Sequence, residues 1–328
     1  MMKTMKTKIF TLSFAAAAAL QACNPCPDEE LRMSTLFVYP GYTDVTFEIT
    51  LDHAPKASDG AEFILSVDGD ERSVQVEGIT TLITLTKLES GKDFDYNVTL
   101  RHTTKDEKHT KAGGIFYTLP EGPVDLDLPS GLKWTSANLG ASRPDENGNY
   151  YAWGETEPKT DYSWSTYKWC HEGSSTELTK YVSDDYAGAA ELAYNGLMDM
   201  KRSLDSADDP ATAALGASYR TPSADDWQEL LSYCKWESVN FGHAGGYLVK
   251  SKSEPNNAKK RIFIPFAGWM SGPQRITGKN DYWACDRALG TSPKFASSFE
   301  ALSKKLYTEG SKVERCEGHT VRAVCQSN

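Results

Sequence analysis

Aromatic and charged side chains are interleaved in one short stretch near the C-terminus of the chain. The candidate ligand contacts within it are Trp269, Arg275, Asp281, Tyr282, Trp283 and Arg287. Aromatic faces stack on sugar C–H surfaces or anchor protein contacts, while Arg and Asp side chains form directional hydrogen bonds. The stretch therefore predicts a binding face. The alternative for its aromatic residues is a place in the hydrophobic core.

Carboxylates that could serve in hydrolysis occur as adjacent pairs, namely Asp184-Asp185, Asp208-Asp209 and Asp225-Asp226. A glycosidase needs two carboxylates that face each other across a cleft. Adjacent residues point in different directions, so these pairs are better explained as loop and helix-start residues. The chain also has no Gly-x-Ser-x-Gly elbow. We therefore expect a protein that is not an enzyme.

The charge of the chain limits its partners. A net charge of −10 and a pI near 5.2 leave no basic stripe that could displace phosphate counterions, so no nucleic-acid partner is expected. The 328 residues are enough for one very large domain or two ordinary ones. Apart from Cys23, the cysteines are Cys26, Cys170, Cys234, Cys285, Cys316 and Cys325, and these contain no CxxC pair, so neither a zinc knuckle nor a thioredoxin-like site is indicated.

The N-terminus has the pattern of an export signal. Lys3, Lys6 and Lys8 precede an uncharged run, Ile9 to Leu20, that is too short to span a bilayer as a stable helix. Leu20-Gln21-Ala22-Cys23 directly after this run resembles the bacterial lipobox. The resemblance implies a signal peptide over residues 1–22 and lipidation at Cys23. An ordinary secretory signal is the alternative.

Residues 23–30 form an acidic tether, with Asp28, Glu29 and Glu30 a few places after Cys23. The tether resembles the surface-export signal of Bacteroidetes-type lipoproteins. This implies an outer-membrane lipoprotein that is exposed on the cell surface and held to the membrane by its N-terminal lipid.

Residues 31–120 have a β pattern throughout. Val45 to Leu51 alternates strictly between apolar and polar residues, and Asp68-Gly69-Asp70 separates Phe63–Val67 from Ser73–Val76 as a hairpin turn would. Leu82–Leu85 and Tyr96–Leu100 continue the series. Such closely spaced strands predict a β-sandwich.

The segment from Leu88 to Tyr96 resembles the corner of fibronectin type III domains, in which a Leu, a turn Gly and an aromatic residue precede an alternating strand. Phe94 stands where that family usually has tyrosine. The resemblance implies a fibronectin III/Ig-like sandwich that acts as a spacer. The prolines and glycine of Thr118 to Pro123 mark its end.

Residues 124–328 carry a series of motifs in order. These are Asp127-Leu128-Pro129-Ser130-Gly131-Leu132-Lys133-Trp134, Tyr151-Ala152-Trp153-Gly154-Glu155, Tyr219-Arg220-Thr221-Pro222, Ala267-Gly268-Trp269, Tyr282-Trp283 and Val321-Arg322-Ala323-Val324. The series resembles the Fibrobacter major paralogous domain family. That resemblance implies an α+β C-type-lectin-like fold with paired terminal strands and long loops on one side. The fold class we expect for the whole chain is therefore β-rich and multidomain.

One helix is expected in this second domain. Ser223 is a good N-cap with Asp226 three places on, and Trp227, Leu230, Leu231 and Cys234 then follow at helical spacing. A second, weaker helix is expected over Ala189 to Met200.

Glu254-Pro255-Asn256 resembles the calcium-binding tripeptide of mannose-type C-type lectins. Calcium takes six to eight oxygens, and the Trp-Asn-Asp motif that completes its shell in those lectins is absent. Glu254 and Asn256 are therefore weak metal candidates, and we expect no cofactor beyond a possible structural calcium. The alternative is a polar turn.

The lectin-like fold, by analogy, implies two disulfides, Cys285–Cys316 and Cys234–Cys325. Cys170 is then left free or paired with Cys26. Formylglycine-generating enzymes share the broader fold and use a redox-active cysteine pair. Cys316 and Cys325 come nearest to that pair, but the residues around them do not follow the enzyme pattern.

Two functions remain open from the sequence. The first is a surface lipoprotein that binds an extracellular glycan or protein through the loops of its lectin-like domain, as an adhesin does. In one variant of this function, the exposed loop residues of the domain are diversified by a retroelement. The second is a structural component of a surface fimbria or envelope complex, with no affinity for free glycans.

Overall fold

The computed structural model describes residues 31–55, 60–102, 110–278 and 281–326. The packing of the chain divides it into two compact units. The first contains Thr46–Ile83, Asp95–Gly114 and the residues up to Val38. The second contains Tyr39–Val45, Thr84–Phe94 and Ile115–Asn328. The predicted signal peptide, Cys23 and Cys26 lie outside the described residues.

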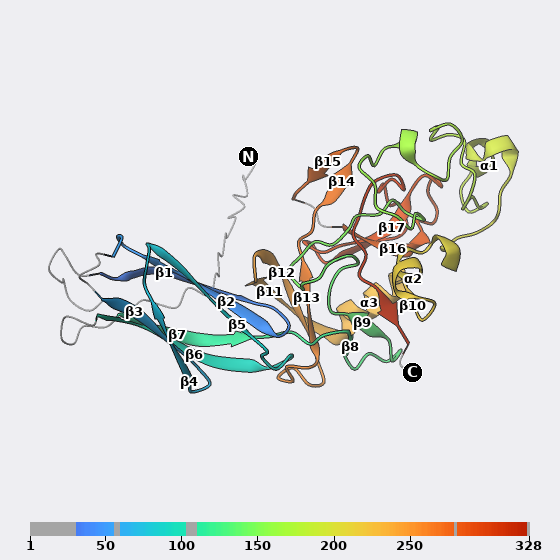
Figure 1. Ribbon diagram of the computed structural model, residues 1–328. Helices are drawn as coiled ribbons and strands as arrows, with labels where there is room; N and C mark the ends of the chain where they lie inside the picture. Colours follow the sequence, from blue (N-terminus) through green and yellow to red (C-terminus); the bar gives the residue numbers. More distant parts are fainter. Residues whose placement is uncertain (1–30, 56–59, 103–109, 279–280, 327–328) are drawn as a thin grey trace, which may run out of the picture. The chain divides into compact units, whose positions relative to one another are not determined.

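A β-sandwich of two sheets supplies most of the first unit (Figure 1). One sheet has the order β1-β2-β5, from β1 (Met33–Pro40), β2 (Asp44–Leu51) and β5 (Thr80–Thr86). The other has the order β4-β3-β6-β7, from β3 (Ala61–Val67), β4 (Asp70–Gln75), β6 (Asp93–His102) and β7 (Thr110–Tyr117). This is the fibronectin type III-like sandwich that the sequence predicts.

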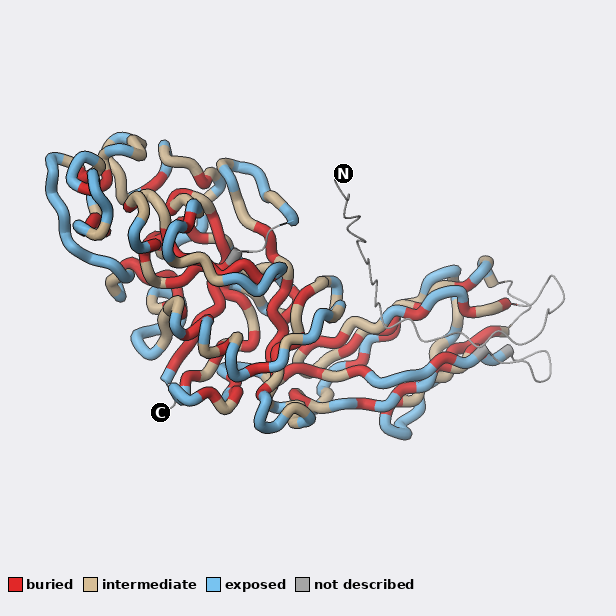
Figure 2. The backbone as a smooth tube through the Cα atoms, turned by 180° about the vertical axis from the view of Figure 1, so that it is seen from behind, coloured by how far each residue is buried: buried red, intermediate tan, exposed pale blue. Residues whose placement is uncertain are grey.

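Alternation along β2 shows why these residues form a sandwich. Val45, Phe47, Ile49 and Leu51 are all buried, and the residues between them are half-buried. A strand places successive side chains on opposite faces, so this period of two turns one apolar face toward the other sheet. Figure 2 shows the same alternation of burial along the sandwich strands.

The predicted hairpin is confirmed. β3 and β4 pair antiparallel with Val67 opposite Asp70, which leaves Asp68 and Gly69 as the turn. Both turn residues have positive φ, 49° and 92°. Asp and Gly tolerate this conformation, and it matches the twist of the strands on either side.

The first and last strands of the second unit's C-terminal part lie in one sheet. Its order is β10-β19-β9-β8, from β8 (Pro123–Asp125), β9 (Lys133–Thr135), β10 (Tyr219–Arg220) and β19 (Val324–Cys325). β19 pairs antiparallel with β9, with Val324 opposite Trp134. The terminal segments therefore close the unit, as the sequence resemblance implies.

Three further sheets complete the second unit. One joins β11 (Cys234–Phe241), β12 (Ala244–Ser251) and β13 (Arg261–Pro265). Another is the hairpin of β14 (Trp269–Ser271) and β15 (Gln274–Ile276). The third joins β16 (Asp281–Arg287), β17 (Ala296–Glu300) and β18 (Lys305–Tyr307).

The helix α3 (Ala224–Tyr233) begins as predicted. The Ser223 side chain accepts a hydrogen bond from the Asp226 amide, and the Asp226 side chain accepts one from the Ser223 amide, which is a capping box. Trp227 and Leu230 are buried on one face, and the ring of Trp227 stacks on Phe299 with centroids 4.4 Å apart. Cys234 belongs to β11 and not to the helix.

The other helices differ from the prediction. The expected helix over Ala189 to Met200 is reduced to α1 (Ala189–Leu192) and a 3-10 turn at Tyr194–Gly196, where Asn195 is left-handed. A short helix that the sequence did not suggest, α2 (Pro210–Leu215), starts at Asp209. Two more 3-10 turns lie at Trp164–Thr166 and Ser206–Asp208.

Carboxylates that accept hydrogen bonds from the backbone organise the long irregular segment between β9 and β10. Asp199 accepts hydrogen bonds from the amides of Tyr181 and Val182, both at 2.9 Å. Asp209 caps α2 through the Ala211 amide at 2.8 Å and also accepts from the Thr221 hydroxyl at 2.8 Å. These contacts satisfy backbone donors that no helix or sheet covers.

Candidate functional site

The predicted binding residues on β16 lie in the core of the second unit. Tyr282, Trp283 and Arg287 are at most 1% exposed. The Tyr282 hydroxyl donates to the Pro265 carbonyl at 2.7 Å, and the Trp283 indole N–H donates to the Tyr151 carbonyl at 2.6 Å. Buried side chains with these partners cannot meet a ligand that arrives from solvent. This corrects the expectation that the three contact a ligand.

Arg287 pairs with a carboxylate far away in the sequence. Its guanidinium donates to Asp185 and, at 2.8 Å, to the Ser183 hydroxyl. Burial lowers the pKa of Arg287. Burial also opposes ionisation of Asp185, but the Ser183 hydrogen bond and the Arg287 charge outweigh it and lower the pKa of that carboxyl. The pair ties β16 to the irregular segment.

The remaining predicted contacts lie elsewhere. Trp269 is half-buried in β14, and Arg275 is exposed on β15 but donates to the Ala267 carbonyl at 2.9 Å. The backbone of Asp281 is in β16, and its side chain lies outside the described part. The structure therefore does not gather the six candidate residues on one surface.

At the weak metal candidate, the positive charge beside the carboxylates comes from a lysine side chain. The Lys260 ammonium donates to Asp127 and, at 2.9 Å, to Glu254, while Asn256 is exposed nearby in the chain. The hydrogen bond from Lys260, together with those from Ser253 and Ser251, lowers the pKa of Asp127 to about 2. No group of three or more His, Cys, Asp or Glu residues suited to a metal ion occurs in the described ranges.

Five cysteines are free thiols in the described part, namely Cys170, Cys234, Cys285, Cys316 and Cys325. Cys316 packs among Tyr162 and Tyr167, whereas Cys285 lies beside Asp286. Neither expected disulfide is therefore formed in this structure. Burial raises the pKa of the Cys234 thiol to about 12 and also raises that of Cys285.

A pocket of about 420 Å³ opens where four segments of the second unit converge. We call it the Asp286 pocket; the polar lining residues that are exposed or half-buried are Arg202, Ser203, Asp225, Asp286, Thr308 and Glu309, while Arg287 and Ser297 of the lining are buried. They come from the irregular segment, the first turn of α3, the end of β16 and the loop after β18. Its volume lies in the range of small-ligand sites.

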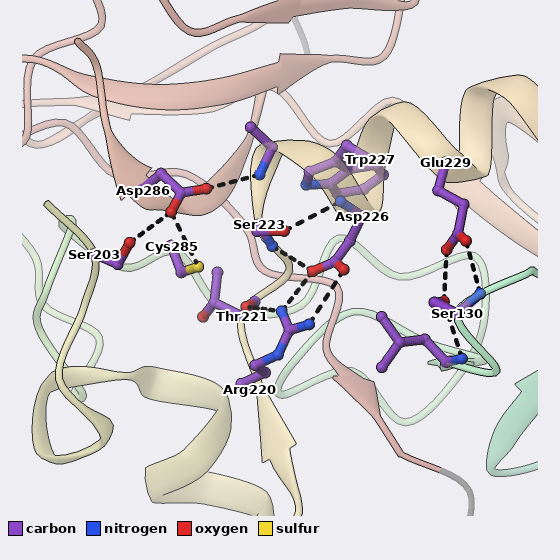
Figure 3. A network of polar contacts seen from close by, with 12 residues as sticks. Ser130, Ser203, Arg220, Thr221, Ser223, Asp226, Trp227, Glu229, Cys285 and Asp286 are labelled. Atoms are coloured by element: carbon purple, nitrogen blue, oxygen red, sulfur yellow. Dashed lines mark hydrogen bonds and ion pairs between the residues drawn. The ribbon is translucent and has the colours of Figure 1, made fainter.

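Asp286 holds these segments together (Figure 3). Its Oδ1 accepts a hydrogen bond from the Ser203 hydroxyl at 2.7 Å, and its Oδ2 accepts one from the Ala224 amide at 2.9 Å. A carboxylate is favourable at the N-terminal end of a helix, where backbone N–H groups point outward. The pocket wall is thus fixed by hydrogen bonds to a charged group.

The rest of the network fixes the start of α3. The Arg220 guanidinium donates to both carboxylate oxygens of Asp226, and Figure 3 shows this fork beside the capping box. At the next turn of the helix, Glu229 accepts from the amide of Ser130 at 2.8 Å and from its hydroxyl at 2.6 Å. The predicted Ser223 cap is therefore one part of a larger rigid assembly.

The lining of the pocket carries an excess of negative charge. Asp225 and Glu309 are exposed and make no hydrogen bond or ion pair with other residues of the described chain. Arg202 pairs with Asp184 at 3.5 Å, and Arg287, which also belongs to the lining, pairs with Asp185. Both cations are thus balanced by partners outside the lining, and the lining carboxylates are left in excess.

Comparisons with known proteins concern the sandwich alone. No protein-family model matches the chain, and no curated protein matches it in sequence. Among solved structures, it is similar to a human fibronectin type III domain of collagen α-1(XX), with 19% identity over 31% of this chain and 97% of that chain and a TM-score of 0.23.

The third fibronectin III domain of the human KIAA0343 protein matches with 14% identity over 31% of this chain and 94% of its own, at a TM-score of 0.22. A fibronectin type III domain of the human KIAA0970 protein matches with 19% identity over 31% and 89%, at 0.20. TM-scores this low do not establish a shared fold. The assignment of the sandwich rests on the order and burial of its own strands.

The binding stretch predicted from the sequence contains Asp286, but Asp286 is not among its candidate contacts, and Thr308 lies beyond the stretch. Asp286 lies one place before Arg287 and on a strand, where side chains alternate between faces. The predicted candidate faces the core, and its neighbour reaches the pocket. The adjacent pair Asp225-Asp226 divides in the same way, because Asp226 caps the helix and Asp225 lines the pocket.

Proposed function

We propose that the protein is a cell-surface lipoprotein that binds an extracellular ligand through the loops of its C-terminal, C-type-lectin-like domain. The observation that carries the proposal is the Asp286 pocket, whose polar walls come from four separate segments fixed by hydrogen bonds. Binding sites are concave and carry a few convergent polar groups on a rigid frame. The fibronectin type III-like sandwich then acts as a spacer.

Two features support the lectin-like domain. Its first and last strands pair, through β9 and β19. The chain between them contains a long irregular segment whose backbone is held by hydrogen bonds to the carboxylates of Asp199 and Asp209. Long irregular loops on a rigid scaffold are where binding functions concentrate.

The test is binding of the full chain, solubilised in detergent, to an array of glycans and to extracts of extracellular proteins. We expect binding that is equal in calcium and in EDTA, because Lys260 occupies the cation position beside Asp127 and Glu254. Binding lost in EDTA would instead support a calcium site. If neither array nor extract yielded a ligand, the proposed function would be wrong.

The lipid anchor has its own test. Cys23→Ser should release the protein from the membrane fraction and abolish incorporation of a labelled fatty acid. Cys170→Ser, a substitution at a cysteine within the folded part, is the matched control and should change neither. No helix in the described residues is long and apolar enough to cross a membrane. Retention of the Cys23→Ser protein in membranes would argue against a lipid anchor.

A structural role in an envelope complex is favoured by one observation. Leu197, Met198 and Met200 are 73%, 36% and 48% exposed in one loop. Met200 has a left-handed φ of 58°, and Asp199 between them is fixed by two backbone amides. Exposed apolar groups with flexible thioethers suit a protein contact. Stable co-purification that is lost in a Leu197→Ser, Met198→Ser double variant would support this second function.

A further inference from the structure

We propose that a separate pocket of the second unit binds an uncharged peptide segment of a protein partner and holds one aromatic side chain of that segment. The pocket has a volume of about 260 Å³ and lies where the loop after β9 approaches the end of α2. We call it the Tyr42 pocket. All of its described lining belongs to the second unit. It shares no lining residue with the Asp286 pocket, and a peptide site here is independent of the proposed function.

The loop after β9 leaves three backbone N–H groups without a partner. The amides of Thr135 and Leu139 donate to carbonyls of the segment that leads into β19, at 2.9 and 2.8 Å. The amides of residues 136–138 between them make no hydrogen bond with the rest of the described chain. All three residues line the pocket, and Ser136 and Asn138 are buried. Buried backbone donors are nearly always paired, so a ligand carbonyl at this place would complete the pattern.

Tyr42 adds a side-chain donor to the same pocket. The Ser136 hydroxyl donates to the Tyr42 oxygen at 3.1 Å, which leaves the Tyr42 proton for another acceptor. Burial raises the pKa of Tyr42, so its hydroxyl stays uncharged at neutral pH. A peptide carbonyl is an acceptor that both amides and phenols bind.

The lining selects against charged ligands. No Asp, Glu, Lys or Arg occurs among the described residues that line the Tyr42 pocket, although 24% of the residues of the chain are charged. A charged group placed there would lose its hydration without gaining a counter-ion. A neutral ligand keeps the hydrogen bonds and avoids this cost.

Apolar groups make up much of the remaining wall, namely the side chains of Tyr42, Pro123, Leu139, Leu215 and Tyr219. Aromatic side chains bury large areas against such walls. The volume is below the range of sites that enclose a whole drug-sized ligand, so it suits one side chain and the peptide groups beside it. Peptide recognition combines main-chain hydrogen bonds with a side-chain pocket in this way. A hydrocarbon or lipid chain would fill the pocket but leave the amides unpaired.

The experiment measures binding of the full chain, in detergent, to N-acetyl-phenylalanine methylamide and to the same derivatives of aspartate and lysine by saturation-transfer NMR. The phenylalanine derivative should bind, and the other two should not. Leu215 is 42% exposed at the pocket, and Leu215→Lys should weaken binding of the phenylalanine derivative about tenfold, because the ring would bury an ammonium group. The matched control is Leu197→Lys, since Leu197 is 73% exposed and does not line the pocket. It should bind as the parent does.

Ala137→Pro removes one of the unpaired N–H groups and should weaken binding about fivefold, the loss expected for one neutral hydrogen bond. Circular dichroism checks the folding of each variant, and Leu215→Lys decides if Ala137→Pro does not fold. The peptide site is wrong if the phenylalanine derivative fails to bind the parent, or binds both pocket variants as tightly as the parent. Equal binding of the aspartate derivative to the parent would also overturn it. Each of these outcomes leaves the Asp286 pocket and the proposed function untouched.

Discussion

The Asp286 carboxylate accepts a hydrogen bond from the Ala224 amide at 2.9 Å, and this contact joins the end of β16 to the first turn of α3. The same carboxylate reaches the irregular segment through the Ser203 hydroxyl. One side chain thus connects three segments that are distant in sequence. A ligand at the pocket would meet a wall that is already in place.

Asp286→Ala should lower the free energy of unfolding by about 1–3 kcal/mol, because a helix N–H and a hydroxyl both lose a charged acceptor. Asp225→Ala changes an adjacent helix-start carboxylate that has no hydrogen-bond partner in the described residues, and it should cost less. Urea unfolding of both variants measures the difference. Equal losses would show that Asp286 does not hold the segments.

The capping box makes a second prediction. Ser223→Ala removes the acceptor for the Asp226 amide and should cost about 1 kcal/mol of stability. Ser232→Ala is the control in the same helix, since Ser232 is exposed and its side chain bonds only to Gln228 within α3. Thermal or denaturant unfolding compares the two. A larger loss in the control would contradict the assignment of Ser223 as the cap.

The Lys260 site predicts a particular response to acid. The pKa of Asp127 in the folded protein is lowered to about 2 from its usual value of 3.8, first by the Lys260 hydrogen bond. Its contribution to stability is therefore fully present above the unfolded pKa, and it is lost as the pH falls from about 5 toward 2. Lys260→Met removes the largest cause of the shift and leaves the hydrogen bonds from Ser253 and Ser251.

We thus expect the urea midpoint to fall less between pH 7 and pH 3 in Lys260→Met than in the parent. The matched control is Lys250→Met, which breaks the more exposed pair with Glu237 at 2.7 Å. Its acid response should stay close to that of the parent. Identical responses in all three proteins would mean that the Asp127 shift contributes nothing to stability.

The thiols should react slowly in the folded protein. Burial raises the pKa of Cys234 to about 12, so almost none of it is thiolate at pH 8, and thiolate is the reactive form. A thiol reagent should modify it only after denaturation. Peptide mapping without reductant should find no Cys285–Cys316 or Cys234–Cys325 link. Recovery of either linked peptide would restore the pairing that the lectin-like resemblance implies.

Local patterns predicted the elements that depend on neighbours in sequence. The strict alternation of β2, the Asp68-Gly69 turn and the Ser223 cap were all readable from a few adjacent residues. Strands β1 and β7 were not predicted. α2 was also missed, because its start depends on Asp209, whose carboxylate is shared with the distant Thr221.

The site depended on contacts that sequence patterns do not contain. Arg287 was expected on a surface, but Asp185, which lies 102 positions away in the chain, pairs with it in the core. The role of Asp286 was not predicted for the same reason, because its partners Ser203 and Ala224 are far away in the sequence. The types of residue in the binding stretch were informative, whereas their orientation was decided by segments that fold against them.

The pairing of β9 with β19 separates two tasks in the second unit. Hydrogen bonds between the entering strand β9 and the leaving strand β19 hold the two ends of the intervening chain together. The residues between these strands are therefore not needed to bring the ends near each other. The entropy of closing a loop grows only slowly with its length. Segments such as the one from Ser136 to Ser218 can therefore lengthen, shorten or change composition across related chains while the frame stays closed, which gives this unit room to acquire new specificities.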